Sequence, residues 1–158
     1  MKIESIVTIK KELKHLSQAE LLELCLRLGK FKKENKALLT YLLFESHDED
    51  GYIASVKSSL DELFEGINAD SYFYMKKTIR KILRHIRIYS RYSLQKTTEI
   101  ELLLYFCERL NELKPSIHKN ITLSNLYERQ ILSIKKKVSL LHEDLQYDYN
   151  LMLKSLEQ

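Results

Sequence analysis

The 158-residue sequence has very few residues that interrupt helices, with only three glycines and one proline. Gly29, Gly51, Gly66 and Pro115 all fall between segments of helical periodicity, so we interpret them as helix boundaries. Their spacing fits neither a P-loop nor a dinucleotide-binding fingerprint, because the glycines of those motifs lie within a few residues of one another. The sequence therefore predicts no nucleotide site of either kind.

Cysteine is also scarce. The two cysteines, Cys25 and Cys107, each lie in an apolar helical segment, where a thiol usually behaves as a small core hydrophobe. No second pair of ligands accompanies them, so a zinc site is not expected. We predict that both thiols are unpaired, metal-free and packed in the interior.

Long apolar runs are missing. The longest is the six residues 102–107, far short of the roughly 20 residues that span a bilayer. The opening segment, MKIESIVTIKKE, interrupts its apolar residues with charges and so lacks the apolar stretch of a secretory signal. The sequence predicts a soluble, cytoplasmic protein with no transmembrane segment.

Recognisable catalytic and metal-binding motifs are also missing. Glu12 and His15 form a single Glu-x-x-His pair, whereas a di-iron bundle needs two. His142 and Glu143 begin a zincin-like motif, but Gln146 stands where the second histidine is required. The acidic stretch 45–50 lacks the spacing of a calcium loop and is interpreted as a solvated turn. We predict no catalytic residue, metal or cofactor, and an enzyme whose site is assembled from distant residues stays as the opposing hypothesis.

What the sequence does contain is apolar residues repeating every three or four positions, the pattern of packed helices. Helices are predicted over about 2–14, 17–29, 33–46, 50–67, 70–93, 97–113 and 122–156. No segment alternates like a strand, and the short connections favour antiparallel neighbours. The predicted fold is one all-α domain, residues 1–158, in which about six or seven helices form an antiparallel array, either a bundle or a short superhelix.

Several details of these helices can also be predicted. Ser17 and Glu20 have the spacing of a capping box, and Asp50 can cap the fourth helix. Gly29 is expected to end the second helix. Segments 33–46 and 97–113 are apolar around most of their circumference, so both should be largely buried, and the second of them is the best candidate for the centre of the core.

The last predicted helix is unusually long, about 50 Å at 1.5 Å per residue, because no glycine or proline interrupts it. Its apolar seam consists of Tyr127, Ile131, Ile134, Val138, Leu141, Leu145, Tyr149, Met152 and Leu156. A helix that is longer than a small core is wide would leave part of this seam exposed to solvent. Self-association or partner docking through the C-terminal helix is therefore one hypothesis for function.

Acidic residues are absent from one stretch of the chain. Residues 71–98 contain eight basic and no acidic side chains, whereas the rest of the chain holds 18 basic and 22 acidic ones, so the net charge of +4 conceals a strongly basic element. On a helix, the basic residues of this stretch up to Arg91 occupy an arc of about 140°, apart from an apolar face that includes Ile79, Ile82 and Ile86. One side of this helix should pack and the other should be positive.

We call this positive side the basic face, and its candidate polyanion-binding residues are Lys77, Arg80, Lys81, Arg84, Arg87 and Arg91. Such a row could bind phosphates of nucleic acid, with Tyr74 and Tyr92 beside it as possible stacking groups. An acidic protein or a membrane surface could also be its partner. The alternative is that the basic face binds no partner, and is either solvated or paired within the molecule, for example with the acidic stretch 45–50.

Two phrases, LLTYLLFESHDEDGYI and LHEDLQYDYNLML, resemble a family of small bacterial all-α proteins of about this length. That family has no established activity, catalytic residue or cofactor. The resemblance implies a helical fold and a bacterial, cytosolic origin, and it leaves the function open.

Overall fold

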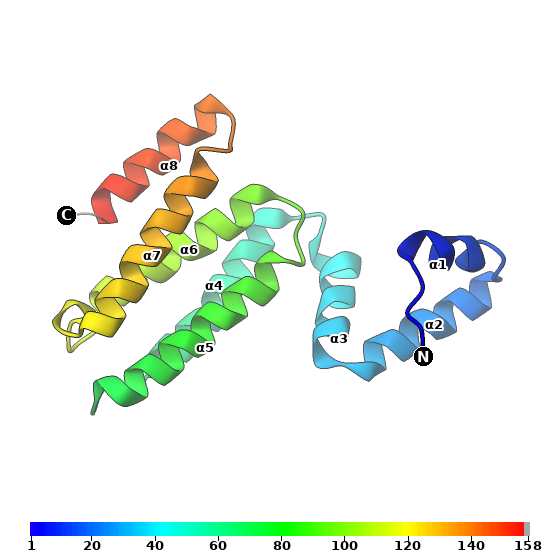
Figure 1. Cartoon of the computed structure of the whole chain (residues 1–158), viewed down its shortest axis with the longest axis horizontal. Coiled ribbons are helices and arrows are strands. Elements are labelled where there is room, and N and C mark those ends of the chain that lie inside the picture. Colours follow the sequence, from blue (N-terminus) through cyan, green and yellow to red (C-terminus); the bar gives the residue numbers. More distant parts are fainter. Residues whose placement is uncertain (157–158) are drawn as a thin grey trace. The chain divides into compact units, whose positions relative to one another are not determined.

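The computed structural model describes residues 1–156, which contain eight α-helices and no strand. The helices form two compact units, Met1–Phe44 and the larger unit from Glu45 to the C-terminal end, and each is described by itself (Figure 1). The predicted all-α class is confirmed, and the prediction of a single domain stays a prediction. Among the described residues, no helix is both long enough and apolar enough to cross a membrane.

The N-terminal unit contains α1 (Ile6–Leu13), α2 (Gln18–Phe31) and α3 (Lys33–Thr40), followed by the π-helical turn η1 (Tyr41–Glu45). The predicted capping box at the start of α2 is confirmed. The Ser17 hydroxyl accepts from the backbone N–H of Glu20, and the Glu20 carboxylate accepts from the backbone N–H of Ser17 at 2.7 Å. The backbone N–H of Ser17, and next its hydroxyl, donate to the Glu20 carboxylate, and both hydrogen bonds stabilise its charged form and so lower the pKa of Glu20.

Gly29 does not end α2, contrary to the prediction. It lies inside the helix, which continues to Phe31. A Cβ atom at this position would lie 2.9 Å from the end of the Leu39 side chain of α3, so glycine lets α2 and α3 pack here without displacing that side chain. The glycine therefore serves tertiary packing and not termination.

The expected burial of the third helix is also wrong. Within Met1–Phe44 only Tyr41 is buried, while Leu42, Leu43 and Phe44 are exposed. Cys25 is exposed as well, so its predicted place in a core is wrong, although it is a free thiol. An apolar pattern identified these helices but did not determine what covers them.

The larger unit contains α4 (Glu49–Glu65), α5 (Tyr72–Ser90), α6 (Lys96–Glu112), the 3₁₀ turn η2 (Ile117–Lys119), α7 (Ile121–Val138) and α8 (Glu143–Leu156). Successive helices run up and down beside one another (Figure 1). The predicted central position of the helix at 97–113 is confirmed, because α6 packs against α4, α5, α7 and α8. Its buried residues are Thr98, Ile100, Leu102, Leu103, Leu104, Phe106, Cys107 and Leu110.

The cap of α4 is Asp48 and not Asp50. The Asp48 carboxylate accepts a hydrogen bond from the backbone N–H of Gly51 at 3.0 Å, which satisfies one of the free donors of the first turn. A Cβ atom at Gly51 would lie 2.3 Å from that carboxylate. The glycine thus leaves room for the capping side chain, a role that its apparent function as a boundary did not suggest.

The single long C-terminal helix is a wrong prediction. Helix α7 ends at Val138 and a turn follows. The side chain of Gln146, in the first part of α8, donates a hydrogen bond to the carbonyl of Leu141 in this turn at 2.8 Å. Helix α8 then returns beside α7, where the Tyr127 hydroxyl donates to the carbonyl of Leu156 at 2.7 Å. Two consecutive four-residue steps of the apolar seam meet at Leu145, just after this turn. Two short helices therefore cover each other's apolar faces.

Candidate polyanion-binding groove

Helix α5 is oriented by its apolar stripe. Met75, Ile79, Ile82 and Ile86 are completely buried, and they recur at the three- and four-residue spacing of one helical face. The helix begins where the Ser71 hydroxyl accepts from the backbone N–H of Tyr74. Burial of this stripe turns the opposite side of the helix toward solvent.

The cations of α5 lie on that exposed side without carboxylate partners. Lys77, Arg80, Lys81, Arg84 and Arg87 are exposed, and within residues 1–156 none of them forms an ion pair. Two other cations of the larger unit do have carboxylate partners, since Lys137 lies 2.8 Å from Glu99 and Arg109 lies 3.0 Å from Asp61. The suggested pairing of the basic face with residues 45–50 is therefore not formed in the described part of the chain.

Helix α7 runs beside α5 in the same direction, with α6 packed against both (Figure 1). Two adjoining depressions, which share Arg80 and Arg84 in their linings, form a groove beside the two helices. One part, of about 520 Å³, is lined by Arg80, Leu83, Arg84, Arg87, Leu126, Arg129, Gln130 and Ser133. A second part, of about 870 Å³, shares Arg80 and Arg84 and extends to Phe73 and Thr122 near the starts of α5 and α7. We call the two parts together the basic groove.

Helix α7 supplies one wall of the basic groove. Arg129 projects a fourth guanidinium group, and Gln130 and Ser133 add polar atoms beside it. Leu83 of α5 and Leu126 of α7 are buried and form the apolar floor. The sequence around Arg129 does not indicate that this residue lies beside α5. Its helix carries charges of both signs, and Arg129 is about 40 residues from the arginines of α5 in the chain.

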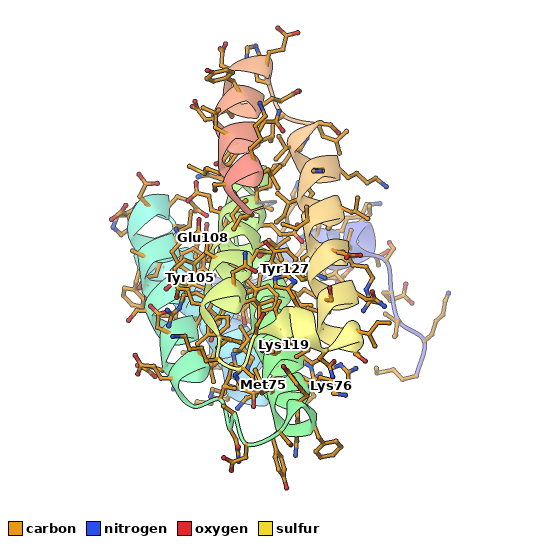
Figure 2. The ribbon with its side chains drawn as sticks, turned by 90° about the vertical axis from the view of Figure 1, so that its left-hand side faces the viewer. Met75, Lys76, Tyr105, Glu108, Lys119 and Tyr127 are labelled. Atoms are coloured by element: carbon orange, nitrogen blue, oxygen red, sulfur yellow. The ribbon has the colours of Figure 1, made fainter. Side chains whose placement is uncertain are left out.

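The wider end of the groove lies near the start of α5. The Tyr72 hydroxyl donates to the carbonyl of Ser116 at 2.9 Å, which ties this end of α5 to the segment that leads into α7. Lys76 and Lys119 lie at the same end of the unit (Figure 2). Phe73 lines the groove there with its side chain 71% exposed. Cations and an exposed aromatic ring thus share one end of the groove.

The structure brings five of the six residues of the basic face together along this groove. Arg91, the sixth, is the C-cap of α5 and does not line it. Of the two tyrosines suggested for stacking, Tyr74 is half exposed and meets the Phe73 ring edge-on at 5.5 Å, while Tyr92 packs edge-on against Tyr89. Among the described residues, the aromatic side chain that lines the groove is Phe73, and its position was not predicted from the sequence.

Three side chains with raised pKa values, Tyr105, Cys107 and Tyr149, lie on α6 and α8. Burial raises the pKa of Tyr105 to about 12, reinforced by its hydrogen bond to Asp61, and burial together with Glu101 raises the pKa of Tyr149. Burial also raises the pKa of the Cys107 thiol to about 12. Figure 2 shows Tyr105 and Glu108 on α6. Because these shifts favour the neutral forms, the tyrosines act as hydrogen-bond donors and the thiol is a poor nucleophile.

No group of three or more histidine, cysteine, aspartate or glutamate side chains within residues 1–156 is placed to hold a metal ion. No protein-family model matches the chain, and no curated protein or solved structure is significantly similar to it. The function is therefore argued from the geometry and charge of the groove.

Proposed function

We propose that this protein is a non-enzymatic binding module of the bacterial cytoplasm that holds nucleic-acid backbone in the basic groove. The observation that carries this proposal is the convergence of four guanidinium groups on one groove: Arg80, Arg84 and Arg87 from α5 and Arg129 from α7, none of which forms an ion pair with a carboxylate of residues 1–156. Arginine presents a planar fork of donors that matches two phosphate oxygens at once. Each of these four arginines can therefore bind a phosphate group.

The arrangement of charges along α5 favours a polyanion over a purely solvated face. Arg80 and Arg84, like Lys77 and Lys81, are four residues apart, and like charges at this spacing cost a helix about 0.2–0.5 kcal/mol per pair. Within residues 1–156 no carboxylate forms an ion pair with these four side chains, so their repulsion is not relieved there, whereas a row of phosphates would relieve it. An acidic protein could relieve it too, but regularly spaced phosphates match a row of forked donors along one helix more closely than scattered carboxylates do.

This proposal is tested by the salt dependence of binding. With four arginines on phosphates, the slope of log affinity against log salt should be about −3 for a single strand, so affinity should fall about 50-fold between 50 and 200 mM salt. Fluorescence anisotropy with labelled DNA and RNA strands of several sequences measures this slope. Because phosphate contacts do not read bases, the affinity should vary little with sequence. Absence of binding at low ionic strength would refute the proposed function.

Self-association is a second candidate, and it is supported by a different segment from the one predicted. Tyr149, Leu153 and Leu156 of α8 are buried inside the larger unit, although Met152 stays half exposed, so the C-terminal seam needs little further cover. The N-terminal unit instead exposes most of its apolar side chains, including Leu22, Leu26, Leu28 and Phe31 of α2. A unit of this size that buries almost nothing is too small to be stable alone.

We expect a second copy of the chain to cover α2. The full-length protein should then sediment as a dimer, and replacing Leu22 and Leu26 by aspartate should convert it to a monomer, because charges cannot be buried unpaired at an apolar interface. Leu132, which is 64% exposed on α7, provides the control, since Leu132→Asp should leave the dimer intact. A monomer at high protein concentration would reject this candidate.

A further inference from the structure

We propose that the occupant of the basic groove is a single strand of nucleic acid, with one of its bases stacked on Phe73. This inference rests on the proposed function, to which it adds the type of strand and a contact to a base. Three features of the groove support it: an exposed aromatic ring at one end, an apolar floor, and a second wall supplied by α7.

The first feature is Phe73 itself. Its ring is 71% exposed, and it lines the groove together with Lys76 and Lys77. Isolated exposed apolar residues are common, but an aromatic ring beside a row of cations is the arrangement with which single-strand-binding proteins stack bases while holding the backbone. In a duplex the faces of the bases are already stacked on one another, so only an unpaired base can use this ring.

The second and third features concern the shape of the groove. Its floor is formed by Leu83 and Leu126, and its walls carry Arg84 on one side and Arg129 on the other. A duplex resting across α5 would meet exposed cations but would not need the floor or the α7 wall. From Phe73 to Arg87 the groove follows about 20 Å of helix, which suits about four nucleotides, the lower end of the site sizes of single-strand-binding folds.

The test compares an ordinary single strand with an abasic strand of the same length, using the full-length protein. Phe73→Ala should weaken binding of the ordinary strand at least about fivefold and should leave binding of the abasic strand unchanged. Because the ring is exposed, the substitution should not disturb folding, which circular dichroism verifies. Phe44→Ala is the matched control, because Phe44 is 66% exposed, lies outside α2 and does not line the groove.

A second variant tests the α7 wall. Arg129→Glu should weaken binding of a single strand at least about tenfold, since it exchanges a phosphate contact for repulsion. Lys136→Glu makes the same charge change on α7 and does not line the groove, so its effect should be several times smaller. The single strand should also bind more tightly than a duplex of the same length.

The possible outcomes separate this inference from the proposed function. If the strands bind with the expected salt dependence but Phe73→Ala weakens neither strand, or Arg129→Glu acts no more strongly than Lys136→Glu, then backbone binding stands and the single-strand inference is overturned. Tighter binding of the duplex would overturn it too. If neither strands nor duplex bind, the proposed function itself fails.

Discussion

Replacing Arg80, Arg84 and Arg87 together by glutamate is expected to weaken nucleic-acid binding by about 1,000-fold or more. A hydrogen bond to a charged group contributes about 1.5–3 kcal/mol, so loss of three phosphate contacts alone accounts for this factor, and the new negative charges add repulsion. The three side chains are exposed and line the groove, while the apolar stripe at Ile79, Ile82 and Ile86 is unchanged. The variant should therefore keep the helical circular-dichroism spectrum of the unmodified protein.

The matched control replaces Lys32, Lys33 and Lys36 by glutamate. These residues are exposed in the N-terminal unit, and the control changes the net charge of the protein by the same amount. Its affinity should fall much less, because long-range repulsion is screened within about 10 Å at moderate salt. Equal losses in the two variants, measured by anisotropy, would mean that net charge and not the groove governs binding.

Replacing Phe106 by alanine is expected to lower the free energy of unfolding by about 3–5 kcal/mol, a large part of the stability of a domain this size. The Phe106 side chain is completely buried on α6, and its ring centroid lies 5.9 Å from that of Phe64 on α4. Truncation leaves a cavity at the contact between the central helix and its neighbour. Urea denaturation followed by circular dichroism measures the loss.

Leu132→Ala is the control for this prediction. Its side chain is 64% exposed on α7, so the substitution should change the free energy of unfolding by no more than about 0.5 kcal/mol. A loss below about 1 kcal/mol for Phe106→Ala would contradict the central position of α6. Stability and binding should also be separable, because the buried stripe of α5 and its three groove arginines lie on opposite faces of that helix.

The basic face illustrates how far a sequence pattern can be taken. Spacing along one helix was enough to predict that Arg80, Arg84 and Arg87 share a face, because helical geometry relates residues three and four apart. It could not predict Arg129, whose place beside them depends on α6 bringing α5 and α7 together. The place of Phe73 in the groove could not be predicted for a related reason. Whether its ring is exposed depends on which side chains from other helices pack against it.

The helix boundaries also show which features can be predicted from local sequence and which cannot. Ser17 and Glu20 were correctly predicted to cap α2, because a capping box involves only atoms within one turn. The break between α7 and α8 was missed, since it has no glycine or proline and is held by the side chain of Gln146 and by packing of α8 on α7. A continuous helix and two packed helices satisfy the same local pattern.

By itself, the sequence determined the helical class, the apolar stripe of α5 and the acid-free run of cations, because all three follow from periodicity and composition along one segment. The tertiary structure alone decided which apolar faces are covered: those of α6 are, and those of α2 are not. It also decided that the cations of α5 share a groove with α7. The physical reason is that burial and electrostatic pairing depend on residues far apart in the chain, and spacing within one helix carries no information about them.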